Sequence, residues 1–400
     1  MSDARALPPG PLIAFYGDDF TGSSAAMEVL AFAGLETILF LAPPTQERLA
    51  RFAHYRAIGV AGVARSRPPE WMDEHLPPVF EQLAGIGAPV VHYKVCSTFD
   101  SAPHIGNIGR AAEIARRRFP GWIPLVVSDP GMGRFQAFGN LFAHANGVGY
   151  RLDRHPTMAA HPTTPMHEAD LGRHLAAQTD LRVGLVDFAS MKRGRADALL
   201  AQEIERGAAI VSVDVLDPET LREAGRLIWE RGAAQQFVLG SQGVEQALVA
   251  HWRAAGLMPL TSASVGCARV ERLAAVSGSV SPITAAQIEH ACARGFEPIV
   301  LDARLAVHEH WLAAEVQRVT ALGGEAIARG RDPLVFTATG PDDPRVAAFR
   351  EAVRASGTPI AAVNDRLGAA LGDILNALVR QCGLRRVVIS GGDTSSHAAS

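Results

Sequence analysis

Short apolar runs alternate with amphipathic stretches along the first 250 residues. The apolar runs predict strands at 12–16, 37–41, 57–61, 89–93, 124–127, 182–186 and 210–213. Apolar positions at helical spacing predict helices near 21–33, 71–84, 105–117, 171–178, 191–205 and 218–231. Residues 236–252 add a further strand, turn and helix. Strands that alternate with helices in this way predict a mostly parallel sheet covered by helices on both faces.

The pattern lapses between Arg253 and Arg269, where small and polar residues show little periodicity. We therefore predict an N-terminal domain over 1–253 and a C-terminal domain over 270–400. A strand, loop and helix reappear at 272–295, followed by strands at 296–302, 332–340 and 384–396 and helices at 344–356 and 365–382. The predicted fold class is α/β, with two domains, each a mostly parallel sheet flanked by helices.

The chain ends at Ser400, four residues after a Gly-rich turn at 391–396 that ought to open a helix. A last strand without a covering element is unusual in an α/β domain. Two explanations stay open: either the C-terminal domain is truncated at its C-terminus, or its sheet ends in an unusual way.

Composition narrows the class of protein. Of 400 residues, 48% are hydrophobic and 20% charged, with a formal net charge of −3, which is typical of a soluble globular protein. The absence of a basic run argues against a nucleic-acid partner. No apolar stretch is long enough for a bilayer and no signal segment opens the chain, so we expect a cytoplasmic protein without a membrane partner. Four scattered cysteines predict reduced, mostly buried thiols: Cys96, Cys267, Cys292 and Cys382.

Two adjacent carboxylates, Asp18 and Asp19, follow the first predicted strand and precede the helix predicted from Thr21. In an open parallel sheet, ligands bind beyond the carboxyl ends of the strands. One acid there is explained as a helix cap, which the helix dipole stabilises by roughly 0.3–1 kcal/mol. A second acid exceeds that need, and a pair suits binding a polyol, deprotonating a hydroxyl or holding Mg²⁺. The residue types alone do not decide whether this acidic pair only caps the helix or belongs to a functional site; both interpretations stay equally open.

Three cations follow other strands of the same predicted sheet. Lys94, one of two lysines among 38 lysine and arginine residues, comes directly after the strand at 89–93. Arg65 and Arg134 lie in loops after two further strands, and a guanidinium fork matches carboxylate or phosphate geometry. Each alone is explained as a solvated surface charge. Together they predict a site for an anionic polyol at the sheet edge that carries the aspartates.

Three histidines, His155, His161 and His167, recur every six residues in a Pro-rich connection. This spacing matches neither a helix or strand face nor a zinc-ligand pattern. We interpret the connection as a lid or wall of the substrate site.

Two Gly/Ser turns follow strands of the second predicted domain, at 276–282 and 389–396. Backbone N–H groups in such turns, together with a helix N-terminus, can receive phosphate oxygens. Neither turn is a Walker A loop or a G-x-G-x-x-G fingerprint. The sequence therefore leaves it equally open whether these turns bind phosphate or only connect a strand to a helix. Carboxylates in one domain and phosphate-binding turns in the other predict a phosphotransferase whose active-site cleft lies between a substrate domain and a nucleotide domain.

Seven motifs occur in order along the chain: YGDDFTGS (16–23), YKVCSTFDSAP (93–103), GR (133–134), HPTTPM (161–166), GSQGVE (240–245), SGSVSPITAAQI (277–288) and GGDTSSHA (391–398). This combination resembles the four-carbon acid sugar kinases, long catalogued as a domain of unknown function. Some members carry the label type III effector Hrp-dependent protein. The resemblance runs from about Leu12 to the end of the chain.

The resemblance implies that the chain uses ATP and Mg²⁺ to phosphorylate a hydroxyl of a small sugar acid such as threonate, erythronate or 3-oxo-tetronate. Either Asp18 or Asp19 would be the catalytic base. The implied substrate-binding residues are Asp18, Asp19, Arg65, Lys94, Asp100 and Arg134, to which we add Ser97 and His161. The implied nucleotide-binding residues are Ser277, Gly278, Ser279, Gly391, Gly392, Asp393 and Thr394, to which we add Ser281.

The chain departs from the family pattern in two places. The stretch SDPGM before Arg134 replaces the more usual PAFPENGR type, which leaves the substrate open. Relatives also continue past the GGDTSS turn, so we expect the 400-residue form to bind ATP poorly. A non-catalytic binding or effector protein is the alternative, and the missing G-x-G-x-x-G argues against a nicotinamide-dependent dehydrogenase. The oligomeric state stays open, a homo-oligomer included.

Overall fold

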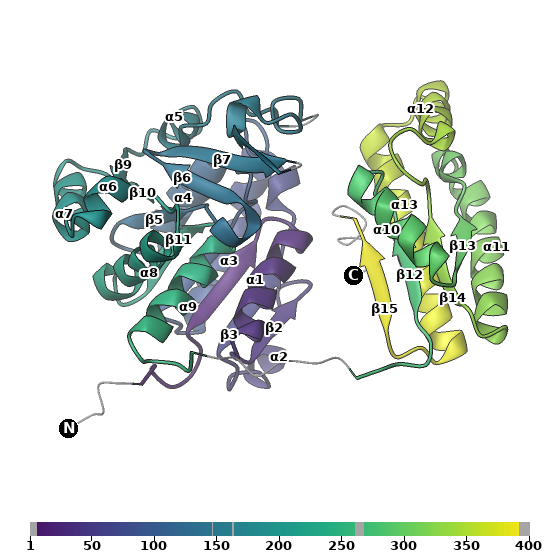
Figure 1. Ribbon diagram of the computed structural model, residues 1–400, viewed down its shortest axis with the longest axis horizontal. Helices are drawn as coiled ribbons and strands as arrows, with labels where there is room; N and C mark the ends of the chain where they lie inside the picture. Colours follow the sequence, from purple (N-terminus) through teal and green to yellow (C-terminus); the bar gives the residue numbers. More distant parts are fainter. Residues whose placement is uncertain (1–5, 146, 162–163, 261–267, 392–400) are drawn as a thin grey trace. The chain divides into compact units, whose positions relative to one another are not determined.

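The computed structural model describes residues 6–145, 147–161, 164–260 and 268–391 (Figure 1). The chain divides into two compact units, 1–265 and 266–400. Several residues singled out in the sequence lie outside the described residues: Cys267, Gly392, Asp393, Thr394 and the middle of the HPTTPM motif. Cys96, Cys292 and Cys382 are free, half-buried thiols. None of the described helices is long and apolar enough to cross a membrane.

The first unit is built on an eight-stranded sheet in which every pairing is parallel, in the order β2-β3-β1-β4-β11-β5-β10-β9. The strands are β1 (Ile13–Gly17), β2 (Thr37–Phe40), β3 (Ala57–Ala61), β4 (Val90–Lys94), β5 (Ile123–Val126), β9 (Val183–Val186), β10 (Ile210–Val213) and β11 (Gln236–Gly240). The six interior strands of this order are buried along their whole length: β3, β1, β4, β11, β5 and β10. Burial on both faces explains why they read as continuous apolar runs in the sequence.

Helices cover both faces of this sheet. One apolar core packs α1 (Phe20–Phe32), α6 (Phe188–Lys192), α7 (Ala196–Glu205), α8 (Pro218–Arg231) and α9 (Gly243–Ala254) on one face. A second core packs α3 (Pro69–Gly85), α4 (Ile108–Arg116) and α5 (Leu171–Ala176) on the other. Helices α1 and α9 lie side by side (Figure 1). A short helix α2 (Gln46–Ala50) and the 3-10 turns Ala64–Ser66, Pro130–Met132 and Leu152–Arg154 complete the unit.

The first unit differs from the sequence prediction in two places. A three-stranded antiparallel sheet, β6 (Arg134–Ala137), β7 (Asn140–Ala145) and β8 (Val148–Arg151), follows β5, where the sequence predicts only loops. The single helix predicted at 191–205 is wrong, because it is broken into α6 and α7. Gly194 between them has a φ of 67°, a left-handed conformation that ends the first helix.

The second unit has a four-stranded parallel sheet in the order β13-β14-β12-β15. The strands are β12 (Ala274–Ser277), β13 (Phe296–Val300), β14 (Asp332–Phe336) and β15 (Val387–Ser390). The helices are α10 (Pro282–Ala293), α11 (Glu309–Ala328), α12 (Pro344–Ser356) and α13 (Ile360–Cys382), with a 3-10 turn at Ala303–Val307. The predicted class of two α/β domains, each with a parallel sheet flanked by helices, is thereby confirmed.

The sequence indicates an exposed helix face at 308–310 but does not predict the rest of α11, the 20-residue helix of this unit. The pair Gly323–Gly324 interrupts its helical pattern. The structure explains Gly323, because a Cβ there would come within 3.0 Å of the side chain of Leu378 on α13. The missing side chain therefore lets α11 and α13 pack closely.

Candidate active site

The carboxyl ends of three neighbouring strands bring together most of the predicted substrate residues. Gly17 at the end of β1 pairs with Ala61 of β3 on one side and with Lys94 of β4 on the other. Asp18 and Asp19 therefore lie between Arg65, which follows β3, and Lys94. The helices after β1 and β4 pack on opposite faces of the sheet. Such a divergence of connections is where open α/β sheets bind ligands.

Asp19 is the N-cap of α1. Its Oδ1 accepts a hydrogen bond of 2.8 Å from the backbone N–H of Gly22. Its Oδ2 lies 3.0 Å from Nη1 of Arg65, and the same Nη1 lies 3.9 Å from Oδ2 of Asp100. Oδ1 of Asp100 in turn accepts a hydrogen bond of 2.7 Å from the Thr98 hydroxyl. Both oxygens of Asp19 thus have structural partners, and Arg65 connects two carboxylates.

Asp18 has a different environment. Its side chain is 1% exposed, and its Oδ1 has no hydrogen-bond partner among the described residues. Burial, and then the charge of Asp19, raises the pKa of this carboxyl to about 8, although Arg65 and Lys94 act in the opposite direction. Its backbone joins the neighbouring loops, because its N–H donates to the carbonyl of Lys94 (2.9 Å) and its carbonyl accepts from the N–H of Arg65 (3.0 Å).

Lys94 is a buried cation at this site, 2% exposed, whose Nζ donates to the carbonyl of Val95 at 2.8 Å. A Cβ at Gly22 would lie 2.6 Å from this Nζ and 2.3 Å from Oδ1 of Asp19. The ammonium and the carboxylate therefore occupy the space that the glycine leaves open in the first turn of α1. With Arg65, Lys94 balances two of the three carboxylates of the site.

The loop after β4 holds Asp100 with a strained backbone. Phe99 is fully buried and has a φ of 56°, which costs a non-glycine residue on the order of 1–3 kcal/mol. The carbonyl of Phe99 accepts a hydrogen bond from the Ser101 hydroxyl (3.0 Å), which also contacts Nε2 of His174 (2.8 Å) and accepts from Gln178 (2.9 Å). Sequence reasoning missed His174 and Gln178, because both lie on or just after α5, far along the chain.

The other predicted substrate residues make different contacts. Nη1 of Arg134, at the start of β6, donates to the carbonyls of Met132, Gly133 and His144, and its buried Nε has no partner among the described residues. Nδ1 of His161 accepts from the N–H of Thr164 at 3.1 Å and so closes a local turn. Ser97 is half-buried. Within the described ranges, no hydrogen bond or ion pair joins these three side chains to Asp18, Asp19, Arg65, Lys94 or Asp100.

A buried carboxylate that the sequence did not single out fixes the β6–β7 turn. Asp214, at the end of β10 and 0% exposed, accepts hydrogen bonds from the N–H groups of Phe138 (2.6 Å), Gly139 (3.0 Å) and Phe188 (3.1 Å). Burial raises its pKa to about 6 in spite of these bonds. Phe138 has a φ of 48°, so this carboxylate holds a turn that the backbone alone disfavours.

We expect Asp214→Ala to lower the free energy of unfolding of the first unit by about 3 kcal/mol, because three buried N–H groups lose their acceptor. A thermal melt followed by circular dichroism measures this loss. Asp187→Ala is the control, since Asp187 only caps the neighbouring helix α6 and its removal costs about 1 kcal/mol. Equal destabilisation by the two variants would show that Asp214 does not hold the turn.

In the second unit, the predicted nucleotide turn follows β12. Ser277 ends that strand with 2% exposure, and its Oγ has no partner among the described residues. Ser281 caps α10 by accepting from the N–H of Thr284 at 3.1 Å, and the Thr284 hydroxyl donates to Ser279 at 2.9 Å. Strand β15, which pairs with β12, ends just before Gly391. The two predicted turns thus follow neighbouring strands.

A third turn, with the sequence TATGPDDP, connects β14 to α12 at the same edge of the second sheet. Sequence reasoning did not identify this turn. Oδ2 of Asp343 accepts from the N–H and the hydroxyl of Thr339, both at 2.8 Å, and its Oδ1 accepts from the N–H of Arg345 at 2.9 Å. Although burial acts in the opposite direction, these bonds hold the pKa of Asp343 well below its usual range. A cavity of about 720 Å³ lies between this turn and the start of α10.

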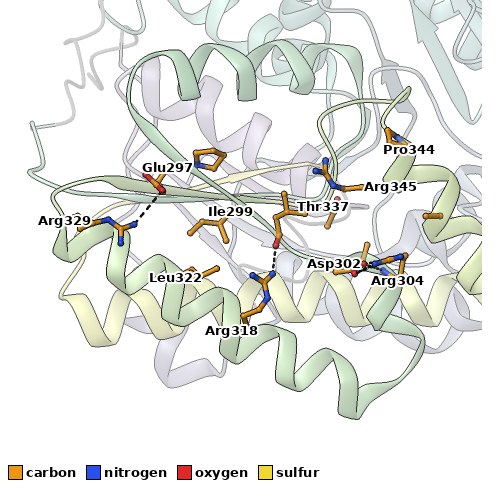
Figure 2. A pocket seen from close by; sticks show the side chains of 14 residues that line it. Glu297, Ile299, Asp302, Arg304, Arg318, Leu322, Arg329, Thr337, Pro344 and Arg345 are labelled. Carbon is orange, nitrogen blue, oxygen red and sulfur yellow. Dashed lines mark hydrogen bonds and ion pairs between the residues drawn. The ribbon is translucent and has the colours of Figure 1, made fainter.

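An arginine-rich cavity of about 520 Å³ lies along the edge strand β13 (Figure 2). Each of its four arginines is paired with a nearby carboxylate: Arg304 with Asp302 (2.6 Å), Arg318 with Glu315 (2.6 Å), Arg329 with Glu297 (3.7 Å) and Arg345 with Asp343 (2.7 Å). Two of these carboxylates, Glu297 and Asp302, line the cavity, whereas Glu315 and Asp343 pair with their arginines from outside its lining. Because every one of these arginines is in an ion pair, the attraction of the cavity for an anion is weakened.

Comparisons with known proteins agree with the division of residues between the two units. Residues 13–248 match the family of sugar-binding N-terminal domains, and residues 274–400 match the family of nucleotide-binding C-terminal domains. Over its whole length the chain is 48% identical to a Paraburkholderia graminis protein named 3-oxo-isoapionate kinase, of which it covers 85%. Over 94% of its length it is 34% identical to a Methylobacterium radiotolerans protein named 3-oxo-tetronate kinase, of which it covers 84%.

Two solved structures share the fold. One is a Salmonella typhimurium protein, with a TM-score of 0.73 and 22% identity over 98% of this chain and 88% of the other. The second is a Haemophilus influenzae protein, with a TM-score of 0.69 and 24% identity over 96% of this chain and 87% of the other.

Proposed function

The chain belongs to the four-carbon acid sugar kinase family, and we propose that it transfers the γ-phosphoryl group of ATP to a hydroxyl of a small sugar acid. The observation that carries this proposal is the buried Asp18 carboxyl, with one unpartnered oxygen between two cations at the carboxyl edge of a parallel sheet. We propose 3-oxo-isoapionate as the first acid to test, because the relative of that name shares 48% identity with this chain.

The two adjacent aspartates have different proposed roles. Asp19 caps α1 and holds Arg65, so its oxygens are occupied. Asp18 has a free oxygen and a pKa near 8, and a general base works best when its pKa lies near the working pH. Asp18 therefore accepts the proton of the attacking hydroxyl in this proposal, and Asp19 positions Arg65.

The cations of the site are proposed to receive the carboxylate of the acid. Arg65 is held by Asp19 with part of its guanidinium exposed, and this preorientation favours a bidentate contact. The unpartnered Nε of Arg134 suits the same anion. Lys94 limits the mutual repulsion of the carboxylates. Ser97, Asp100 and His161 are proposed substrate contacts that rest on the family resemblance.

The residues of the second unit fit a nucleotide. We propose that ATP, which supplies the phosphoryl group when bound, is held at its phosphates by the turns after β12 and β15. These turns provide the buried Ser277 hydroxyl, Ser279, Ser281 and the backbone of Gly278 and Gly391. Gly392, Asp393 and Thr394 stay proposed contacts outside the described residues. That the transfer takes place in a cleft between the two domains, 1–253 and 270–400, stays a prediction.

Mg²⁺ is proposed to arrive with the nucleotide. In kinases this ion is held mainly by phosphate oxygens, with only one or two carboxylates. In the described part of the chain, no group of three or more His, Cys, Asp and Glu side chains is arranged to hold a metal. We therefore assign no protein ligand. The cytoplasm, where ATP is available, is the proposed location.

The experiment that tests this function measures ADP formation from MgATP in the presence of 3-oxo-isoapionate, 3-oxo-tetronate, threonate and erythronate. We expect one of these acids to yield ADP and a phosphate monoester in equal amounts, with the ester identified by ³¹P NMR. The control is ADP formation without acid. Binding of an acid without any ADP formation would contradict the proposal and favour the non-catalytic alternative.

A further inference from the structure

We propose that the nucleobase of ATP binds in an apolar slot between α10, the middle of β13 and the carboxyl end of β14. The inference rests on the proposed kinase function and adds the part of the second unit that recognises the base. The slot is a cavity of about 590 Å³. Its walls include Ala285, Ala286 and Ile288 of α10, Pro298 of β13 and Phe336 of β14.

The chemistry of these walls suits a planar aromatic ring. Ala285 and Ala286 on the α10 side have small side chains, which leaves room for a ring, while Phe336 and Ile288 give the slot a buried apolar base. Burying apolar surface in such a site is worth roughly 25 cal/mol per Å². The cavity lies within the range of roughly 300–1,000 Å³ that is usual for small-molecule sites.

The slot begins at Pro282, the residue next to the proposed phosphate turn. It shares Pro282, Ala285 and Thr339 with the cavity of about 720 Å³ beside the β14–α12 turn. Pro282 is the first residue of α10 and directly follows Ser281, which caps that helix. A nucleotide whose phosphates lie at the Ser279–Ser281 turn can therefore extend along α10 into the slot. From Pro282 to Glu289 the helix rises by about 10 Å, enough for a ribose and base.

The turn that carries Thr339, a residue of the slot wall, is already in place. Gly340 has a φ of 143°, and a Cβ there would come within 3.0 Å of the Ala285 Cβ, so the turn lies directly against the helix. The hydrogen bonds to Asp343 fix this turn. A preformed wall lowers the ordering cost of binding.

The arginine-rich cavity of Figure 2 is a separate site. Its lining includes Ile299 and Leu322, which lie on the α11 side of the sheet. The slot instead lies on the α10 side, where Ile288 packs with Leu334 and Phe336. The two cavities share Pro298 at the edge strand. Since the arginines are ion-paired, the slot is the better site for an uncharged base.

Ala286→Trp fills the slot and tests the proposal. We expect the Kd for MgADP, measured by isothermal titration calorimetry, to rise at least 10-fold, with the KM for ATP rising in parallel and the KM for the acid unchanged. Binding of inorganic tripolyphosphate stays at its wild-type value, because the Ser279–Ser281 turn is intact; this also shows that the variant is folded. Gln287→Trp, at the next position of the same helix, which does not line the slot, leaves all four values unchanged.

The outcomes separate the slot from the function. If Ala286→Trp binds MgADP with wild-type affinity and still phosphorylates the acid, the proposed nucleobase slot is wrong. The proposed kinase function is then unaffected. Weakened MgADP binding in Ala286→Trp supports the slot, even if the wild-type chain forms no ADP with any acid and the kinase proposal fails. Weakened tripolyphosphate binding in Ala286→Trp counts against a base-specific slot.

Discussion

We expect Asp18→Asn to lower kcat for phosphorylation of the sugar acid by about 10²–10⁴-fold, the usual contribution of general acid–base catalysis. The asparagine has nearly the same shape but cannot accept the proton of the attacking hydroxyl. The KM for ATP should stay at its wild-type value, because Asp18 belongs to the first unit and the nucleotide residues to the second. Initial rates of ADP formation over both substrate concentrations measure these effects.

The same substitution is expected to stabilise the protein above neutral pH. The pKa of Asp18 is about 8 in the folded chain against 3.8 in a model peptide, so the folded state holds the proton more tightly. The carboxyl therefore lowers stability progressively as pH rises from about 4 to about 8. Asparagine removes this penalty, on the order of a few kcal/mol at pH 8. Thermal melts at pH 5 and pH 8 should show a higher Tm for the variant, with a clearly larger gain at pH 8 than at pH 5.

Asp19→Asn is the matched control for this prediction. Asparagine is also a good N-cap, so α1 is retained, whereas the ion pair with Arg65 is lost. We expect a higher KM for the acid and a smaller loss of kcat than in Asp18→Asn. The opposite ranking of the two variants in kcat would assign the base to Asp19.

We expect Gly22→Ala to lower kcat/KM for the acid about 100-fold, because a 1 Å misplacement of catalytic groups costs about that much. The new methyl group would meet Oδ1 of Asp19 at 2.3 Å and Nζ of Lys94 at 2.6 Å, so both charged groups must move. Alanine is otherwise favoured over glycine in a helix by about 1 kcal/mol. The loss of activity should therefore come without loss of the folded state, as a Tm measurement can show.

Gly324→Ala provides the comparison. This glycine also lies within a helix, α11, but a Cβ there meets nothing within 4 Å. We expect wild-type kinetics and an equal or higher Tm. Wild-type kcat/KM in Gly22→Ala would mean that the Asp19–Lys94 arrangement does not set the rate.

The strands of the first sheet could be predicted because burial on both faces makes them continuous apolar runs. The same holds for the position of Asp18, Asp19, Arg65 and Lys94, since parallel strands bring their carboxyl ends to one edge. The division of roles between the aspartates could not be predicted. The roles depend on which of the two carboxylates accepts a hydrogen bond from the backbone of α1 and pairs with Arg65. Only the folded loops determine these contacts.

The elements that sequence reasoning missed are held by distant contacts. The β6–β8 sheet has short strands of mixed polarity, and its first turn depends on Asp214, 76 residues beyond Phe138. Asp100 is placed by a left-handed Phe99 that no propensity favours. Helix α11 was hidden by two glycines, one of which serves packing against α13. Local patterns carry no information about such tertiary partners.

The most direct measurement of the central claim is the pH dependence of kcat/KM for the sugar acid in the wild-type chain. If the buried Asp18 is the proton acceptor, log(kcat/KM) rises with unit slope as pH increases and levels off above its pKa of about 8. In Asp18→Asn this rise disappears. A flat wild-type profile between about pH 6 and about pH 9, or an unchanged profile in Asp18→Asn, would contradict the account.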